Sequence, residues 1–164
     1  MHFRLVDEVL EATPERAVGI KAVTLAEEYL QDHFPTFHVL PGVFMLEALV
    51  QTARVVLDAR AAAAGVPPAR MVLGGVRALR YGSFVRPGET LRTEVALDKV
   101  NDDGSVSFKG AATVIRHAAS GAPSAEAETA VSGRFTLRPV RTSAAVAAIP
   151  QGMAAGKAQG QECR

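Results

Sequence analysis

The fold of this chain is decided by a run of nineteen residues, which reads His33-Phe34-Pro35-Thr36-Phe37-His38-Val39-Leu40-Pro41-Gly42-Val43-Phe44-Met45-Leu46-Glu47-Ala48-Leu49-Val50-Gln51. The run places an imidazole ahead of a Pro-Gly pair, and that pair opens a helical pattern with a carboxyl group inside it. Burying an ionisable group is costly unless something uses it. An acid, a base and a free helix N-terminus in one short segment are the parts that proton transfer beside a carbonyl needs.

The spacing of apolar residues in and beyond this run predicts a helix from Gly42 to about Ala64. Pro41 and Gly42 suit a helix start, and the Gly-Val-Pro-Pro sequence at residues 65–68 suits its end. Apolar residues wrap most of this segment, so we expect the helix to be buried on nearly all sides.

Shorter elements are expected on both sides of the helix. Residues 3–9 are expected to form a short amphipathic helix or turn, residues 16–24 a strand, and residues 25–41 an irregular segment. After the helix the apolar period changes to two. Residues 71–81 are apolar on both faces, which is typical of a central strand.

Three further segments alternate apolar and polar side chains from Leu91, from Val106 and from Ala127, as half-buried antiparallel strands do. Residues 101–104 predict a tight hairpin turn and residues 120–123 a looser one. One long helix and about five strands give an α+β fold in which a curved antiparallel sheet wraps around a central helix. Such a sheet leaves exposed edges that a second copy would cover, so we expect a homodimer at minimum and leave higher oligomers open.

The composition narrows the class of protein. The 164 residues, 48% of them apolar, suit one domain, which we place at residues 1–140, followed by a low-complexity, disordered tail at 141–164. Eighteen basic against 17 acidic residues give a formal charge of +1, which offers no footprint for nucleic acid. Charged side chains interrupt the longest apolar segment, so no membrane span is expected. The single cysteine, Cys163, rules out a disulfide framework within the chain, and the N-terminus lacks a signal-peptide pattern, so we expect a cytoplasmic protein without a metal site.

The candidate site consists of His33, Glu47, Gln51 and the amide of Gly42. Gln51 lies four residues after Glu47 on the same helix face and can orient its carboxyl group. Gly42 lies at the helix N-terminus, where unpaired amides and the helix dipole favour negative charge, as in an oxyanion hole. Two plainer interpretations stay open. A loop histidine is commonly a surface residue, and Glu47 can belong to a solvated polar stripe with Gln51, Arg54 and Asp58.

The whole run resembles the 3-hydroxyacyl-[acyl-carrier-protein] dehydratases of bacterial fatty-acid synthesis, of the kind with Glu on the central helix. The family pattern is close to H-F-P-G-x-x-x-M-P-G-V-x-x-x-E-A-x-x-Q. The chain keeps every spacing of that pattern, with matches at His33-Phe34-Pro35, Pro41-Gly42-Val43, Glu47-Ala48 and Gln51. Residues 3–10 and 86–91 also resemble family segments, and the similarity covers roughly residues 1–138.

The resemblance implies a hot-dog fold, in which the long helix is enclosed by the sheet. It implies a site at a dimer interface, with His33 of one subunit facing Glu47 of the other and the Val39 carbonyl orienting His33. The Gly42 amide would bind the oxygen of an acyl thioester that the phosphopantetheine arm of acyl carrier protein delivers. Neutral His33 would then remove the proton beside the carbonyl, and protonated Glu47 would donate a proton to the departing 3-hydroxyl. The products would be water and a trans-2-enoyl thioester, without a metal or redox cofactor.

The chain departs from the pattern at Thr36, where the family has glycine, and at His38, where proline is common. Leu40 in place of Met is a mild change of similar volume. If the family glycine takes a positive φ, Thr36 would strain the loop. Two other functions therefore stay open: an acyl thioesterase of the same fold, and a non-catalytic acyl-binding or assembly subunit. Chain length, pathway and isomerisation of the enoyl product are not encoded in any pattern found in the sequence.

Overall fold

The computed structural model describes residues 3–116 and 127–140. Within these ranges the elements run in the order β1 (Glu8–Ala12), β2 (Arg16–Ala22), η1 (Glu28–Leu30), α1 (Gly42–Ala64), β3 (Met71–Tyr81), β4 (Thr90–Val100), β5 (Val106–Ile115) and β6 (Glu128–Pro139). The expected α+β hot-dog architecture is confirmed, because one long helix packs against a single antiparallel sheet. The expected tail at 141–164 and the looser turn at 120–123 lie outside the described residues.

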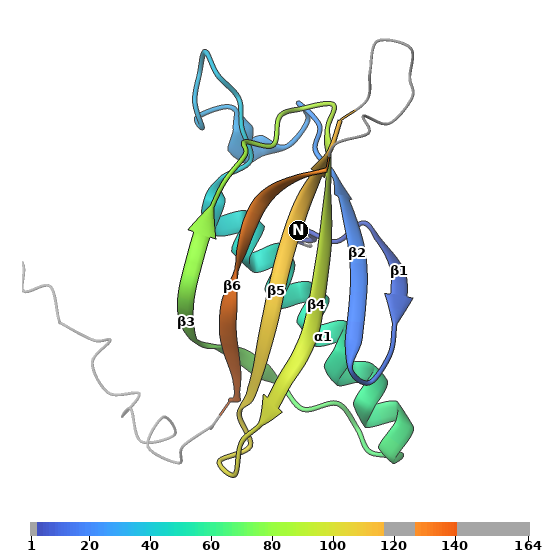
Figure 1. Cartoon of the computed structure of the whole chain (residues 1–164). Coiled ribbons are helices and arrows are strands. Elements are labelled where there is room, and N and C mark those ends of the chain that lie inside the picture. Colours follow the sequence, from blue (N-terminus) through green and yellow to red (C-terminus); the bar gives the residue numbers. More distant parts are fainter. Residues whose placement is uncertain (1–2, 117–126, 141–164) are drawn as a thin grey trace, which may run out of the picture.

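The sheet has six strands in the order β1-β2-β4-β5-β6-β3, and every neighbouring pair is antiparallel. The helix α1 crosses one face of this curved sheet, and β3, which follows α1 in the chain, lies at the edge farthest from β1 (Figure 1). The predicted hairpin between β4 and β5 is confirmed. Its turn closes through a hydrogen bond from the Asn101 amide to the Ser105 carbonyl, with Gly104 at a φ of 79°.

The core lies between α1 and the sheet. The alternation predicted for the three later strands is confirmed, since Leu91, Val95 and Phe108 are wholly buried against the helix side. A polar contact also crosses this layer: the Thr52 hydroxyl on α1 lies 2.7 Å from the Thr93 hydroxyl on β4. This pair fixes the position of the helix along the sheet, and with it the end of the helix that carries the candidate site.

Two expectations for strands need correction. The short helix or turn expected for residues 3–9 is not formed, because residues 3–7 have no regular secondary structure and residues 8–12 pair with β2 as the edge strand β1. Residues 71–81 form the predicted strand, but β3 is an edge strand of this chain rather than a central one. Nearly all of β3 is exposed, although its side chains are apolar on both faces.

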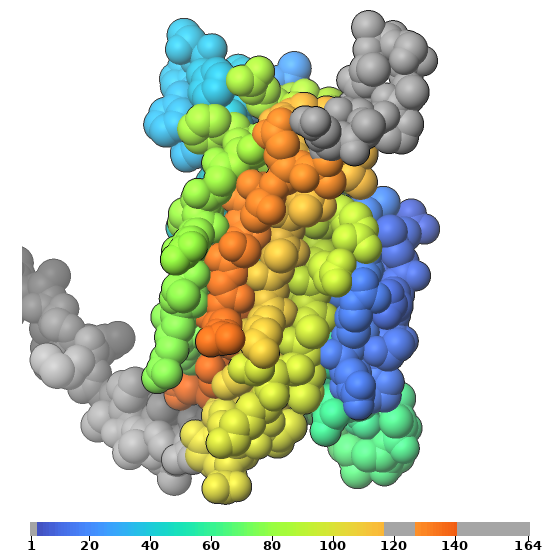
Figure 2. Space-filling view, in the orientation of Figure 1, coloured from blue at the N-terminus to red at the C-terminus, as the bar shows by residue number. Residues whose placement is uncertain are grey.

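The helix begins at Gly42 and ends at Ala64 as predicted, with Gly65 in the left-handed conformation at a φ of 67°. The expectation of burial on nearly all sides is wrong, since Val43, Arg54 and Asp58 are exposed. The last turns of α1 lie beyond the ends of β1 and β2 (Figure 2), and residues 62–64 are exposed. Among the described residues no helix is long and apolar enough to cross a membrane.

Candidate active site

The loop before α1 holds the imidazole of His33 in one orientation. His33 Nδ1 lies 3.0 Å from the Val39 carbonyl oxygen, and the Val39 amide donates to the His33 carbonyl over 3.2 Å. Because a carbonyl can only accept, Nδ1 carries the proton of the neutral ring, and the lone pair is on Nε2. The ring also stacks on Phe34, with centroids 4.3 Å apart. The loop therefore fixes the orientation of the His33 ring, with Nε2 directed away from the Val39 carbonyl.

The tip of the same loop is closed by its own backbone. Phe34 and Phe37 exchange two amide-to-carbonyl hydrogen bonds of 3.2 and 3.0 Å, with Pro35 and Thr36 between them. Thr36 does not have a positive φ, because Ala78 is the only non-glycine residue with one in the described part of the chain. The strain considered for Thr36 is therefore absent. His38 has a structural contact instead, since its Nδ1 lies 2.7 Å from the Leu30 carbonyl oxygen of η1.

The N-terminus of α1 offers backbone donors. The amides of Phe44 and Met45 both donate to the Pro41 carbonyl, and Pro41 gives no side-chain cap to the amides of Gly42 and Val43. These amides lie at the positive end of the helix dipole. The ring of Tyr81, at the end of β3, covers Gly42 so closely that a Cβ built on this glycine would lie 2.9 Å from Tyr81 Cε1.

Glu47 lies one and a half turns into α1, with 32% of its side chain exposed. Gln51 Nε2 donates to Glu47 Oε1 over 3.1 Å. Gln51 is itself held by the N-terminal segment, because the Leu5 amide donates to its Oε1 over 2.8 Å and Phe3 accepts from its Nε2 over 3.3 Å. These contacts decide between the two possible orientations of the Gln51 amide and place its NH₂ group toward Glu47.

Aromatic packing keeps that N-terminal segment in place. The ring of Phe44 lies edge-on to Phe3 and to Tyr29, with centroid distances of 5.0 and 4.7 Å. Burial, with a smaller contribution from the nearby carboxylate of Glu27, raises the pKa of the Tyr29 hydroxyl above its ordinary range. Tyr29 therefore acts as a neutral packing residue beneath the start of α1.

Within the described residues His33 and Glu47 form no hydrogen bond or ion pair with each other. Each is instead oriented by its own partners, His33 by Val39 and Glu47 by Gln51. Sequence reasoning missed one neighbour of the carboxyl group: Arg54 Nη1 lies 3.5 Å from Glu47 Oε1. The sequence did contain a signal for this contact, because Arg54 follows Glu47 by two helical turns in the polar stripe.

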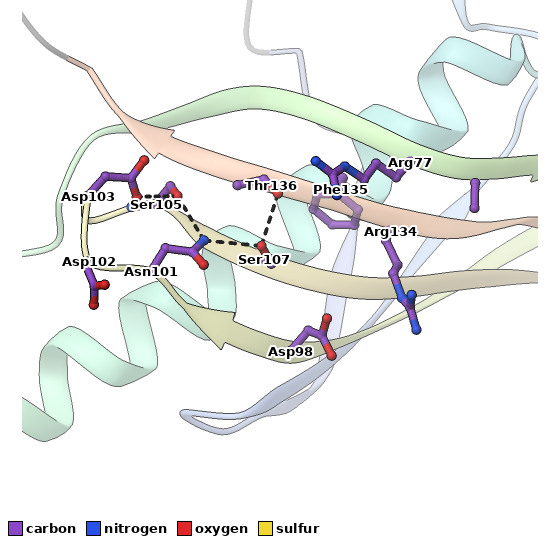
Figure 3. A pocket seen from close by; sticks show the side chains of 11 residues that line it. Arg77, Asp98, Asn101, Asp102, Asp103, Ser105, Ser107, Arg134, Phe135 and Thr136 are labelled. Carbon is purple, nitrogen blue, oxygen red and sulfur yellow. Dashed lines mark hydrogen bonds between the residues drawn. The ribbon is translucent and has the colours of Figure 1, made fainter.

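The described part of the chain also has a separate hollow of about 600 Å³ on the face of the sheet opposite α1. Figure 3 shows Arg77, Arg134, Asp98 and the hydrogen-bonded Ser107 and Thr136 around it. None of the candidate site residues lines this hollow. No group of three His, Cys, Asp or Glu side chains gathers as a metal site anywhere in residues 3–116 and 127–140.

Comparisons with known proteins agree with this geometry. The model of the FabA-like domain matches residues 1–118. The chain is 43% identical over 102 residues to the 3-hydroxyacyl-[acyl-carrier-protein] dehydratase FabZ of Roseiflexus sp. (strain RS-1), a match that covers 60% of this chain and 67% of that protein. It is 40% identical over 113 residues to FabZ of Clostridium perfringens (strain SM101), covering 68% and 78%.

Two solved structures share the fold alone. The dehydratase heterocomplex ApeI:P from Xenorhabdus doucetiae has a TM-score of 0.64 and 17% identity over 90% of each chain. A hypothetical thioesterase with coenzyme A from Streptococcus pneumoniae has a TM-score of 0.56 and 10% identity, covering 81% of this chain and 84% of that chain. The resemblance found in the sequence is confirmed, and the chain belongs to the FabA-like family, in which its curated relatives are FabZ-type 3-hydroxyacyl-[acyl-carrier-protein] dehydratases.

Proposed function

We propose that this protein dehydrates (3R)-3-hydroxyacyl thioesters on acyl carrier protein to trans-2-enoyl thioesters, in fatty-acid synthesis or a related lipid or polyketide pathway. The observation that carries the proposal is the fixed tautomer of His33, with a lone pair on Nε2, on the loop that leads into an uncapped helix N-terminus. A base beside amide donors suits removal of a proton next to a thioester carbonyl.

The reaction then follows from three groups. The Gly42 amide and the helix dipole stabilise the negative charge that develops on the thioester oxygen, which makes the adjacent carbon more acidic. His33 Nε2 takes the proton from that carbon. Glu47 gives a proton to the 3-hydroxyl, the carbon–oxygen bond breaks, and water leaves. One net proton transfer from His33 to Glu47 then makes His33 neutral and Glu47 protonated again, so that the enzyme returns to its starting state.

The same proposal requires two copies of the chain. The edge of β3 is unpaired in the described structure, and Val72, Leu73 and Val76 along it are each 37% exposed. Pairing of β3 with β3 of a second copy would make these strands central and would cover the apolar side chains. A homodimer would also bring His33 of one copy toward Glu47 of the other, which agrees with the lack of a direct contact between them in one chain.

The substrate would arrive on the phosphopantetheine arm of acyl carrier protein, and the three groups named above need no further cofactor for the chemistry. A cytoplasmic location belongs to the same proposal, since acyl carrier protein and the other steps of such a pathway are expected there. Chain-length preference would be set by the lining between α1 and the sheet of the dimer.

The test is to incubate the pure protein with 3-hydroxyacyl thioesters of several chain lengths on acyl carrier protein and to follow the product by mass. Loss of water that disappears in His33→Ala and in Glu47→Gln, with both variants folded, is the expected result. Release of free thiol without loss of water would identify a thioesterase instead. Binding of the acyl thioester without turnover at any chain length would identify an acyl-binding subunit.

A further inference from the structure

We infer that Arg54 is a positioning residue for the carboxyl group of Glu47, and that it stabilises the charge which Glu47 acquires when it gives up its proton. This inference rests on the proposed function, since it assigns a role within the same site. Arg54 lies seven residues after Glu47 on α1, and its Nη1 is 3.5 Å from Glu47 Oε1. Two helical turns separate the residues, which places them on one face of the helix.

The two oxygens of the Glu47 carboxyl group have different surroundings. Gln51 Nε2 and Arg54 Nη1 both approach Oε1, at 3.1 and 3.5 Å. Gln51 Nε2 also donates to the Phe3 carbonyl, which holds its amide in this position. In the described part of the chain no group bonds Oε2. In the proposed reaction Oε1 would therefore be the carbonyl oxygen of the acid, and Oε2 would be the atom that carries the proton toward a substrate.

The orientation of Gln51 does not depend on Arg54. Its amide is fixed by the backbone of Phe3 and Leu5, and the rings of Tyr29 and Phe44 pack around Phe3. Gln51 therefore sets the direction of the carboxyl group, and Arg54 adds a positive charge on the side away from the reacting oxygen. Loss of Gln51 would therefore disturb the orientation of the Glu47 carboxyl group, whereas loss of Arg54 would remove a positive charge beside it.

The charge of Arg54 matters most as the proton leaves. When Glu47 Oε2–H donates to the departing hydroxyl, the O–H bond of Glu47 breaks, and negative charge spreads over both carboxyl oxygens. A guanidinium beside Oε1 interacts more strongly with this developing carboxylate than with the neutral acid. An interaction that strengthens toward the transition state raises kcat and leaves substrate binding nearly unchanged. The side chain of Arg54 is 44% exposed, so this effect is moderated by solvent.

The test compares four forms of the full-length protein in the dehydration assay: the wild type, Arg54→Met, Arg54→Lys and Arg60→Met. Arg60 lies on the same helix and donates to the Pro14 carbonyl, far from Glu47 in sequence, so Arg60→Met removes one helix charge as a matched control. We expect Arg54→Met to lower kcat by about tenfold with little change in KM, Arg54→Lys to restore most of it, and Arg60→Met to retain the wild-type kcat. Equal kcat values in Arg54→Met and Arg60→Met would overturn the inference.

A second measurement does not depend on turnover. Urea unfolding midpoints of Arg54→Met, Glu47→Gln and the double variant report whether the two side chains interact in the folded protein. We expect the loss in the double variant to be smaller than the sum of the two single losses. Additive losses would overturn the contact between Arg54 and Glu47 on which the inference rests. A wild type that releases no water from any substrate would overturn the proposed function and this role together, whereas an active wild type with additive losses would overturn the role of Arg54 alone.

Discussion

At the scale of single residues, the contact between Gly42 and Tyr81 explains why the helix must begin with the smallest side chain. A Cβ at position 42 would lie 2.9 to 3.2 Å from three atoms of the Tyr81 ring. The ring is about half exposed, so it can move, but only by changing the surface above the helix N-terminus. That surface is where the proposed thioester oxygen would bind.

We expect Gly42→Ala to lower kcat/KM by about tenfold, because a displacement of reacting groups by a fraction of an ångström is costly in a preorganised site. The measurement is steady-state kinetics in the dehydration assay, with circular dichroism to verify the fold. A Gly42→Ala, Tyr81→Ser double variant, which lacks the tyrosine ring, is expected to recover part of the loss. An unchanged kcat/KM in Gly42→Ala would show that the contact has no part in the site.

At the scale of elements, local patterns predicted the long strands and the helix but not the edges of the sheet. The limits of α1 were predictable because Pro41-Gly42 and Gly65 are local signals that act through their own backbone preferences. β1 was missed because its sequence, Glu-Val-Leu-Glu-Ala, alternates poorly and buries almost nothing. Its conformation is set by pairing with β2, which is a non-local effect.

β3 contains a β-bulge at which Ala78 has a φ of 51°. A left-handed backbone costs an L-residue with a Cβ roughly 1 kcal/mol or more, and glycine avoids this cost. We expect Ala78→Gly to raise the free energy of unfolding by about 0.5–1 kcal/mol, after the greater entropy of glycine in the unfolded chain is subtracted. Urea denaturation measures this change. A lower stability in the variant would mean that Ala78 makes packing contacts that outweigh the strain.

The outer face of β2 and β4 contains an ion-pair network in which Glu94 binds both Arg92 and Arg16. The hydrogen bond from Arg92, followed by that from Arg16, holds the pKa of the Glu94 carboxyl below its ordinary value. A lowered folded-state pKa contributes stability above the ordinary value, and that contribution is lost as the pH falls through the folded-state pKa.

We therefore expect Glu94→Gln to reduce stability at neutral pH and to match the wild type once the pH is well below the ordinary range of a glutamate carboxyl. Urea midpoints at a series of pH values measure the difference, which is expected to be small because the groups are partly exposed. Asp102→Asn, in the exposed β4–β5 turn, serves as a control for the loss of one surface carboxylate. A difference between Glu94→Gln and the wild type that stays constant with pH would contradict the assigned pairing.

At the scale of the whole molecule, the sequence pointed to candidate site residues more clearly than to their surroundings. His33 and Glu47 stood out because their spacing and neighbours formed one continuous motif. The partial exposure of Glu47 and the edge position of β3 could not be read from the sequence, because each depends on which surfaces one chain leaves uncovered, whereas the helical spacing already placed Arg54 on the same face as Glu47. Residues 71–81 were predicted as a central strand from their apolar faces, a position that β3 would have only in an assembly of two chains.

The central claim is that two copies of the chain build each active site, and a mixing experiment tests it most directly. His33→Ala and Glu47→Gln chains are each inactive in this account, and they are unfolded, mixed in equal amounts and refolded together. Half of the dimers then contain both variants, and each of these has one intact pair of His33 and Glu47, so about a quarter of the wild-type rate of water loss is expected. A mixture that remains as inactive as its two components, beside an active wild type refolded in the same way, would contradict the claim.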